Sequence, residues 1–220
     1  MSIKDQLHKI KKTLPVHVSL IAVSKTKPIS DILEAYEAGQ RVFGENKIQE
    51  MADKYEQLPK DIEWHMIGHL QRNKVKYMAH FVHLIHGVDS FKTLKEINKQ
   101  AIKHHRVIDC LFQLKIAQED TKFGLSLPEV ESIYTSEEFK TLKNIQIKGL
   151  MGMASFTDDT SLIKTEFKTL KSHFNTLKNY NTDNFDLSIL SMGMSGDYKI
   201  AIEEGSTMVR VGSSIFGARN

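Results

Sequence analysis

The sequence has little cysteine and little proline. Cys110 is its single cysteine, so no internal disulfide can form, and its place between Asp109 and Leu111 at the start of an apolar run is typical of a small buried side chain. The 4 prolines and 12 glycines form no linker and no low-complexity tract. We therefore expect a single domain over residues 1–220, in a reducing compartment.

Long apolar runs are also missing. No stretch approaches the ~18 consecutive apolar residues of a membrane span, and the first residues, MSIKDQLHKIKKTL, lack the apolar core of a secretory signal. Lys and Arg outnumber Asp and Glu only by 30 to 27, and they are scattered, which argues against a nucleic-acid partner. These absences predict a cytoplasmic protein that binds neither membrane nor nucleic acid, and we expect a monomer.

Short strands recur at fairly even intervals along the chain. Eight β-branched or apolar runs are found, namely VSLIAVSK, RVFGEN, EWHMIGH, LIHGVDS, DCLFQLKI, IKGLMGMAS, LSILSMGMS and MVRVGSSIFG. Amphipathic helical segments separate them. This alternation predicts an α/β fold, a (β/α)8 TIM barrel, with a doubly wound open sheet as the alternative.

Helical periodicity supports this interpretation. One apolar stripe, at spacings of three and four, consists of Ile163, Phe167, Leu170, Phe174 and Leu177. Four methionines alternate along the sixth and seventh strands and are expected to fill the core, namely Met151, Met153, Met192 and Met194.

Residues at the expected helix ends have the required chemistry. Ser30 is expected to cap a helix over Asp31–Ala38, with Gly39 in a left-handed conformation after it. Ser90 and Gly205 are expected to start and end other helices in the same way.

The two ends of the chain are expected to complement each other. Only Ala218, Arg219 and Asn220 follow the eighth strand run, so we expect no helix after it. The amphipathic segment Ser2–Leu14 is expected to form an extra N-terminal helix that fills this gap.

Reactive groups in such a barrel come from the carboxyl ends of the strands and the loops that follow them. Polar residues are frequent at these ends. They are Lys25, Glu45, Asn46, His69, Asp89, Ser90, Ser155, Ser195, Arg210, Gly212 and Ser213.

Lys25 closes the buried run LIAVSK, so this strand carries an amine to the mouth of the barrel. Desolvation lowers the pKa of an ammonium group, and the neutral amine condenses with an aldehyde. The position therefore suits a Schiff base. The structural alternative is a strand-end lysine that reaches solvent along its flexible stem.

Two Gly/Ser turns follow the seventh and eighth strands. Ser195 lies between Gly193 and Gly196 at a strand-to-helix junction, and VRVGSS adds Gly212 and Ser213. Backbone N–H groups at such junctions can bind a phosphate, and barrels commonly build phosphate sites after these two strands. Each turn alone is a weak signal, but the pair favours a phosphate site.

Arg210 lies inside the apolar strand MVRVG, where a guanidinium group needs an acceptor. One candidate is an ion pair with a carboxylate such as Glu45. The other is a hydrogen bond to a ring nitrogen, which would keep a pyridine nitrogen unprotonated and make the ring a weak electron sink.

The histidines do not suggest a metal ion. His65 and His69 lie on one strand, where four residues separate their Cα atoms by about 13 Å. His80, His83 and His86 flank an apolar run without a cysteine or carboxylate at ligand spacing. We expect no metal.

Four long motifs, LIAVSKTKP, FGENKIQE, WHMIGHLQRNK and LSMGMSGDYKIAIEEGSTMVRVGSSIFGAR, resemble the YggS/PROSC family of pyridoxal phosphate homeostasis proteins. The resemblance extends from about Ser19 to Arg219. It implies a barrel similar to the N-terminal domain of alanine racemase, carrying pyridoxal 5′-phosphate (PLP) on a lysine without an established turnover reaction.

The resemblance also assigns expected roles to residues. Lys25 corresponds to the Schiff-base lysine and Arg210 to the residue near the pyridine nitrogen. The remaining expected cofactor-binding residues are Asn46 beside the cofactor and Ser195, Gly212 and Ser213 around the phosphate. His69 and Met192 are weaker candidates for ring contacts. Lys115 and Gly87 depart from the family pattern, where Asn and Ser are expected.

The expected function is a PLP carrier that buffers the cofactor and delivers it to PLP-dependent apoenzymes, rather than an enzyme. The alternatives are a PLP-dependent amino-acid racemase and a barrel aldolase that uses Lys25 directly. Arg210 argues against the aldolase, which has no pyridine to contact. Lys122, in the loop after the fifth strand, is a further candidate amine for transient PLP binding.

Overall fold

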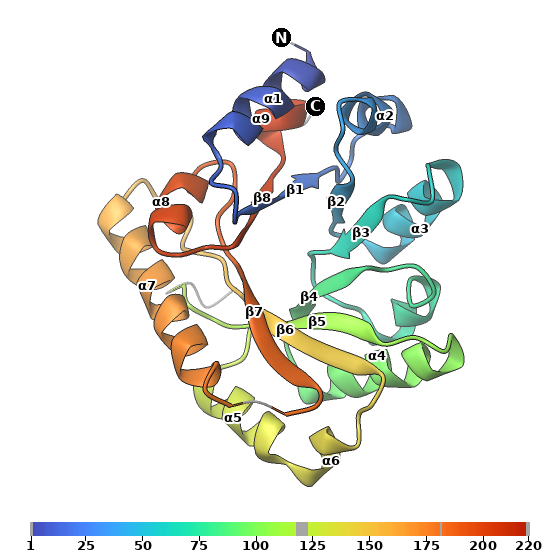
Figure 1. Ribbon diagram of the computed structural model, residues 1–220, viewed down its shortest axis with the longest axis vertical. Helices are drawn as coiled ribbons and strands as arrows, with labels where there is room; N and C mark the ends of the chain where they lie inside the picture. The colour runs from blue at the N-terminus through green and yellow to red at the C-terminus, as the bar shows by residue number, and fades with distance from the viewer. Residues whose placement is uncertain (1, 118–122, 181, 219–220) are drawn as a thin grey trace.

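The computed structural model describes residues 2–117, 123–180 and 182–218. Eight parallel strands close into one barrel, each paired with its neighbours in sequence and β1 paired with β8 (Figure 1). The strands are β1 (Ser19–Val23), β2 (Val42–Glu45), β3 (Glu63–Met66), β4 (Leu84–Val88), β5 (Ile108–Gln113), β6 (Ile145–Met151), β7 (Phe185–Ser191) and β8 (Met208–Val211). All eight predicted strands are confirmed, and the closed sheet confirms the barrel over the open-sheet alternative.

The strands are buried on both faces, as parallel strands in α/β proteins are. A small apolar cluster fills the barrel interior and consists of Ile21, Leu84, Leu111, Met151 and Met208. A much larger cluster lies between the strands and the helices and includes Trp64 and Phe43. Cys110 is fully buried in this outer layer, as predicted.

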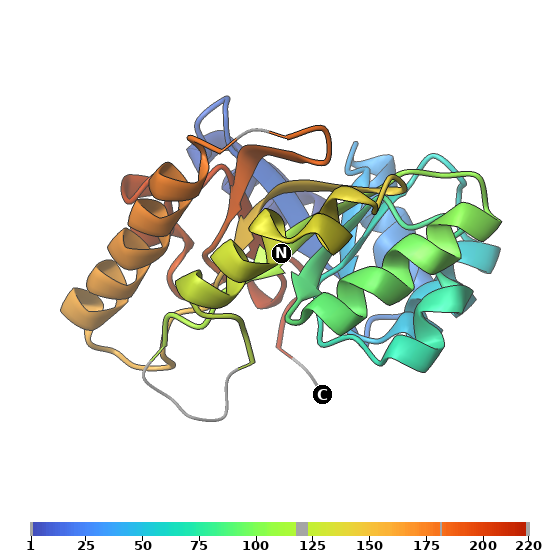
Figure 2. The ribbon, with the colours of Figure 1, turned by 90° about the horizontal axis from the view of Figure 1, so that it is seen from below.

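Helices cover the outside of the barrel, and Figure 2 shows α7 and α4 on opposite flanks with strands between them. The helices are α1 (Ile3–Thr13), α2 (Ile29–Glu37), α3 (Ile48–Gln57), the 3-10 helix η1 (Arg72–Tyr77), α4 (Phe91–Lys103), α5 (Leu127–Thr135), α6 (Glu137–Lys140), α7 (Thr160–Leu177), α8 (Tyr198–Glu203) and α9 (Ser213–Phe216). The five residues of the predicted stripe are all buried along α7. Among the described residues, no helix combines the length and apolar character needed to cross a membrane.

Most of the predicted helix ends are confirmed. Ser90 caps α4, and its side chain accepts a hydrogen bond from the backbone N–H of Thr93 at 3.2 Å. Gly39 and Gly205 follow α2 and α8 with φ angles of 85° and 92°. Glycine adopts this left-handed conformation without the steric penalty of a side chain.

Two predicted boundaries are wrong. Helix α2 begins at Ile29 with Pro28 at its N-cap, so Ser30 lies within the first turn and does not cap the helix. The restricted φ of proline suits an extended residue just before a helix. Strand β8 ends at Val211, earlier than its apolar run suggested, and the one-turn helix α9 follows it, so the expectation of no helix after the eighth strand is also wrong.

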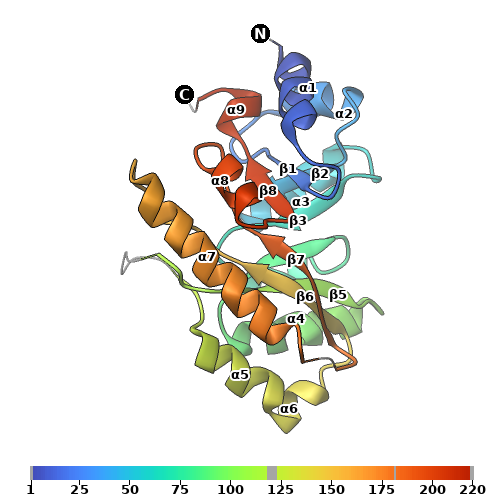
Figure 3. The ribbon, with the colours of Figure 1, turned by 60° about the vertical axis from the view of Figure 1, so that its left-hand side comes forward.

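The N-terminal helix covers the side of the barrel where no long helix follows β8. Figure 3 shows α1 beside α9 and α2, and α1 packs against both. Leu7 and Ile10 are buried on its inner face. Ser2 caps the helix through a reciprocal capping box with Asp5. The predicted role of this segment is therefore confirmed.

A buried ion pair ties α3 to the ends of β1 and β2. The Nζ atom of Lys54 donates to Glu45 Oε1 at 2.8 Å, to the backbone oxygen of Ser24 at 2.8 Å and to Glu50 Oε1 at 2.7 Å. Burial raises the pKa of Glu45 to about 7, although the charge of Lys54 and the hydrogen bonds from Lys54 and Ser24 act in the opposite direction. The stability of this region therefore depends on keeping the Glu45 carboxylate paired.

We predict that Lys54→Met costs about 3 kcal/mol of the free energy of unfolding, because the buried carboxyl group of Glu45 loses its cation and must take up a proton to stay buried. The folded-state pKa of Glu45 then rises further above its ordinary value of 4.5. The folded variant binds more protons than the unfolded variant. Its loss of unfolding free energy relative to wild type therefore grows above pH ~7, by up to about 1.4 kcal/mol per pH unit.

Urea unfolding at pH 6.5 and 8.5 measures this loss. Lys95→Met is the control, because it removes an exposed ion pair with Glu138 and is expected to cost at most about 1 kcal/mol at either pH. A Lys54→Met loss that is equal at the two pH values contradicts the prediction.

Candidate functional site

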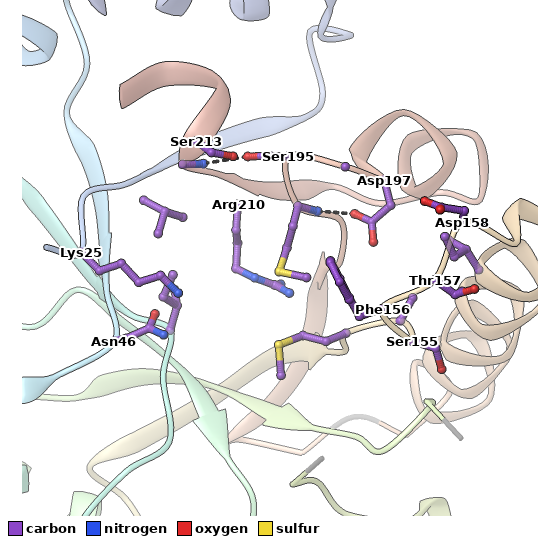
Figure 4. Close-up of a pocket in the computed structure, with 18 of the residues that line it drawn as sticks. Lys25, Asn46, Ser155, Phe156, Thr157, Asp158, Ser195, Asp197, Arg210 and Ser213 are labelled. Atoms are coloured by element: carbon purple, nitrogen blue, oxygen red, sulfur yellow. Dashed lines mark hydrogen bonds between the residues drawn. The ribbon is translucent and has the colours of Figure 1, made fainter. Parts of the chain in front are cut away.

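A cavity of about 510 Å³ opens at the carboxyl ends of the strands. Its lining comes from the segments after β1, β2, β3, β6, β7 and β8. The six expected cofactor-binding residues all line it, namely Lys25, Asn46, Ser195, Arg210, Gly212 and Ser213 (Figure 4). Side chains that are up to 188 residues apart in sequence therefore share one cavity.

Lys25 lies two residues beyond the end of β1 and is half-buried. Its side chain extends toward the middle of the cavity, where Arg210 lies (Figure 4). The next residue, Thr26, has a φ angle of 65°, which is unusual for a β-branched residue. The Thr26 N–H donates to Glu50 Oε1 at 2.6 Å. Because Glu50 also binds Lys54, the buried ion pair of α3 supports the turn that carries Lys25.

Arg210 is buried, and its guanidinium group is held by backbone and hydroxyl oxygens. It donates to the carbonyl oxygen and Oγ of Ser191, at 2.9 and 2.6 Å, and to the carbonyl oxygen of Gly152 at 3.0 Å. Burial lowers the pKa of Arg210 to about 10, so it stays charged at neutral pH. The carboxylate considered as its partner, Glu45, pairs with Lys54 instead.

The turns after β7 and β8 meet at one end of the cavity. The backbone N–H of Gly212 donates to Ser195 Oγ at 3.2 Å, drawn as a dashed line in Figure 4. Gly193 has a φ angle of 96°, and a Cβ there would lie 2.6 Å from the Cβ of Ala201. Only glycine suits this turn. At Gly196 a Cβ would meet no atom of the described chain within 4 Å, so the backbone borders open space.

The loop after β6 supplies a wall of the cavity, of which the sequence had indicated only Ser155. Its start is anchored because the backbone N–H and hydroxyl group of Ser155 both donate to the buried carboxylate of Glu166, each at 2.7 Å. Phe156 follows Ser155 directly and also lines the cavity, and it is 98% exposed. In the sequence, this anchor was indicated only by Glu166, a glutamate among the apolar residues on the buried face of α7.

Other expectations about the lining are corrected. Met151 and Met192 are fully buried, as expected of core residues, but Met153 and Met194 line the cavity. Lys27 also lines the cavity, and its Nζ donates to the carbonyl oxygen of Phe216 at 2.8 Å. Its place after Lys25 in the sequence SKTK was the only signal for it.

The two weaker candidates for ring contacts lie outside the cavity of about 510 Å³, which we call the main cavity. His69 pairs with Asp89, at 2.9 Å between Nδ1 and Oδ2, and stacks on Phe123. It lines a neighbouring cavity of about 310 Å³ that also includes Asn46. Met192 is fully buried, and the structure gives it no place in the lining of either cavity. Lys122 lies outside the described residues.

Known proteins resemble this chain over nearly all its length. The family model of the alanine racemase N-terminal domain matches residues 1–220. A relative named pyridoxal phosphate homeostasis protein from Pasteurella multocida is 38% identical over 206 residues, which cover 92% of this chain and 87% of the relative. A relative of the same name from Aquifex aeolicus is 40% identical over 202 residues, covering 91% and 86%.

Solved structures agree with the sequence comparisons. PipY from Synechococcus elongatus, solved without PLP, has a TM-score of 0.92 at 33% identity and covers 98% of this chain and 100% of PipY. PipY solved with PLP bound has a TM-score of 0.89 at the same identity and coverage. Alanine racemase from Clostridium difficile shares the fold, with a TM-score of 0.77 at 13% identity over 99% of this chain and 57% of the racemase. The chain therefore belongs to the alanine racemase N-terminal domain family and, within it, to the pyridoxal phosphate homeostasis proteins.

Proposed function

We propose that the protein binds PLP in the main cavity, holds it covalently on Lys25 and takes part in PLP homeostasis as a carrier. One observation carries this proposal. A single cavity at the carboxyl ends of the strands brings together an amine, a buried guanidinium group and two Gly/Ser turns. The family membership of the chain and the PLP-bound structure of PipY agree with it.

The residues present fit the chemical groups of PLP. PLP supplies an aldehyde, which condenses with an amine such as that of Lys25. The joined turns after β7 and β8 offer Ser195, Ser213 and backbone N–H groups for the phosphate, where open space borders Gly196. Asn46 provides an amide on the wall that also carries Lys25.

Arg210 bears on the electronic character of the bound ring. Its guanidinium group stays protonated at neutral pH, so in this proposal it donates to the pyridine nitrogen and keeps that nitrogen unprotonated. An unprotonated ring withdraws electrons more weakly than a protonated one, although PLP enzymes use either an Asp or an Arg partner at this nitrogen. The racemase alternative is the weaker one because the relatives named pyridoxal phosphate homeostasis protein are 38% and 40% identical to this chain, whereas the alanine racemase is 13% identical.

The proposal extends to the setting of the protein. The only cysteine is buried, and no internal disulfide is possible, which agrees with a reducing cytoplasm. We further propose that the protein acts as a monomer and that PLP-dependent apoenzymes receive the cofactor from it. The exposed Phe156 at the cavity wall would then lie where a recipient approaches.

We predict that Lys25→Ala abolishes the visible absorbance that borohydride removes from the PLP-loaded protein, because the covalent bond to the amine is lost. Lys27→Ala, which removes the second lysine of the same cavity, is expected to keep it. Borohydride reduction and peptide mass mapping of the wild type are expected to mark Lys25. A label found mainly on another lysine overturns the assignment.

We predict that Arg210→Glu shifts the visible spectrum of the bound cofactor, because a carboxylate favours a protonated pyridine nitrogen. Arg210→Lys, which keeps a positive charge, is expected to shift it less. Circular dichroism shows whether each variant folds, since both lose buried hydrogen bonds to Ser191 and Gly152. A folded Arg210→Glu protein with unchanged spectrum and PLP affinity makes Arg210 purely structural.

We predict that the PLP-loaded protein turns over no amino acid at an enzymatic rate. The assay incubates it with a panel of L-amino acids in deuterated water and follows α-proton exchange, D-isomers and keto acids. An alanine racemase at equal PLP concentration is the positive control. Multiple turnovers that disappear in Lys25→Ala would establish the enzyme alternative.

A further inference from the structure

Three potential metal ligands lie at the end of the barrel opposite the PLP cavity. Glu63 opens β3, His65 follows two residues later on the same strand, and His83 directly precedes β4, the neighbouring strand. Each offers one ligand atom, and these atoms lie within 4.8 Å of one another. His83 Nε2 and Glu63 Oε2 are already 3.6 Å apart. The pairing of β3 with β4 therefore creates a His2Glu cluster.

A buried nitrogen without a partner belongs to this cluster. His65 is 3% exposed, and its Nε2 atom has no hydrogen-bond partner among the described residues. Its other ring nitrogen, Nδ1, lies 3.0 Å from His86 Nε2. A buried polar atom without a partner destabilises the folded state, so a native structure normally satisfies it. A bound ion would do so here.

The state of the His65 ring suits a metal ligand. Burial lowers the pKa of His65 to about 3, so the ring is neutral at physiological pH. If Nδ1–H donates to His86, the lone pair of Nε2 is available to an ion. In the other tautomer His65 accepts from His86 and leaves Nε2–H buried without an acceptor. An ion at Nε2 selects the first tautomer, in which the ligand donates its second N–H to a neighbouring acceptor, as metal-bound histidines do.

The other two ligands can adjust. The side chains of His83 and Glu63 are 52% and 47% exposed, so solvent reaches the cluster. The rings of His65 and His83 are nearly parallel, with centroids 5.5 Å apart, so His83 must rotate to aim a lone pair at a shared ion. Zinc ligands at ~2.0–2.2 Å stand ~3.3 Å from one another, which requires movements of about 1 Å.

The charges around the cluster include both signs. Asp109, at the start of β5, is close enough to His83 for the two charges to interact, and it adds a second carboxylate to this end of the barrel. Lys148 on β6 faces Asp109 and lies 3.9 Å from Asp186. Glu63 is the carboxylate that faces the two histidines, so it balances part of the charge of a divalent cation.

We propose that Glu63, His65 and His83 form a zinc site that closes this end of the barrel. Two imidazoles and one carboxylate are a frequent zinc ligand set, with the fourth position left to water. The site does not depend on the proposed function. It is linked to the PLP cavity by the hydrogen-bonded series His65, His86, Ser191 and Arg210.

Isothermal titration of the purified protein with zinc chloride tests the site. Wild type is expected to bind one zinc ion per chain, and His83→Ala and Glu63→Gln to weaken binding at least ~10-fold, as loss of zinc-site groups does. Both residues are exposed, so these variants are expected to fold. His80→Ala is the control, because His80 belongs to a separate histidine pair with His104 and is expected to leave zinc binding unchanged.

Fluorescence gives a second readout. The only tryptophan, Trp64, precedes His65 on β3. Bound Co²⁺ is expected to quench Trp64 in wild type and in Lys25→Ala, but not in His83→Ala, and zinc is expected to reverse the quenching. If His80→Ala abolishes zinc binding and His83→Ala preserves it, the ion binds adventitiously to surface histidines. That result overturns the proposal. Absence of zinc binding to wild type overturns it as well.

Discussion

The pairing of β1 with β8 is the constraint on which the candidate site depends. Their register places Ile21 opposite Arg210, so the chain beyond β1 and the chain beyond β8 emerge side by side. Lys25 and the Gly212 turn therefore reach one cavity although nearly the whole chain separates them. An open sheet with the same strand order would leave these strands on opposite edges, and the amine and the guanidinium group would not meet.

Buried polar groups inside the closed barrel depend largely on one another for hydrogen bonds, because little solvent reaches them. Arg210 is held by Ser191, Ser191 contacts His86, and His86 contacts His65. This series connects the carboxyl end of the barrel, where PLP is proposed to bind, with the amino end, where zinc is proposed to bind. A similar pairing occurs at the end of β2, where Lys54 compensates for the buried charge of Glu45.

Patterns local in sequence were predictable, and contacts between elements were not. Alternating apolar runs gave the eight strands, and strand-end chemistry indicated Lys25 and Arg210. The partner of Glu45 was missed because Lys54 reaches it from a helix, and periodicity does not specify that contact. His83 was not predicted as a metal ligand for the same reason. Residue spacing along one strand does not indicate which side chains of the neighbouring strand lie beside it. Only the register of β3 and β4 brings His83 to His65.

A crystal structure of the PLP-loaded protein tests the central claim most directly. The account predicts continuous density from Lys25 Nζ to the cofactor, the phosphate within hydrogen-bond distance of Ser195 and Ser213, and the pyridine nitrogen facing Arg210. PLP bound in the neighbouring cavity lined by His69, or bound with its ring nitrogen away from Arg210, would contradict it.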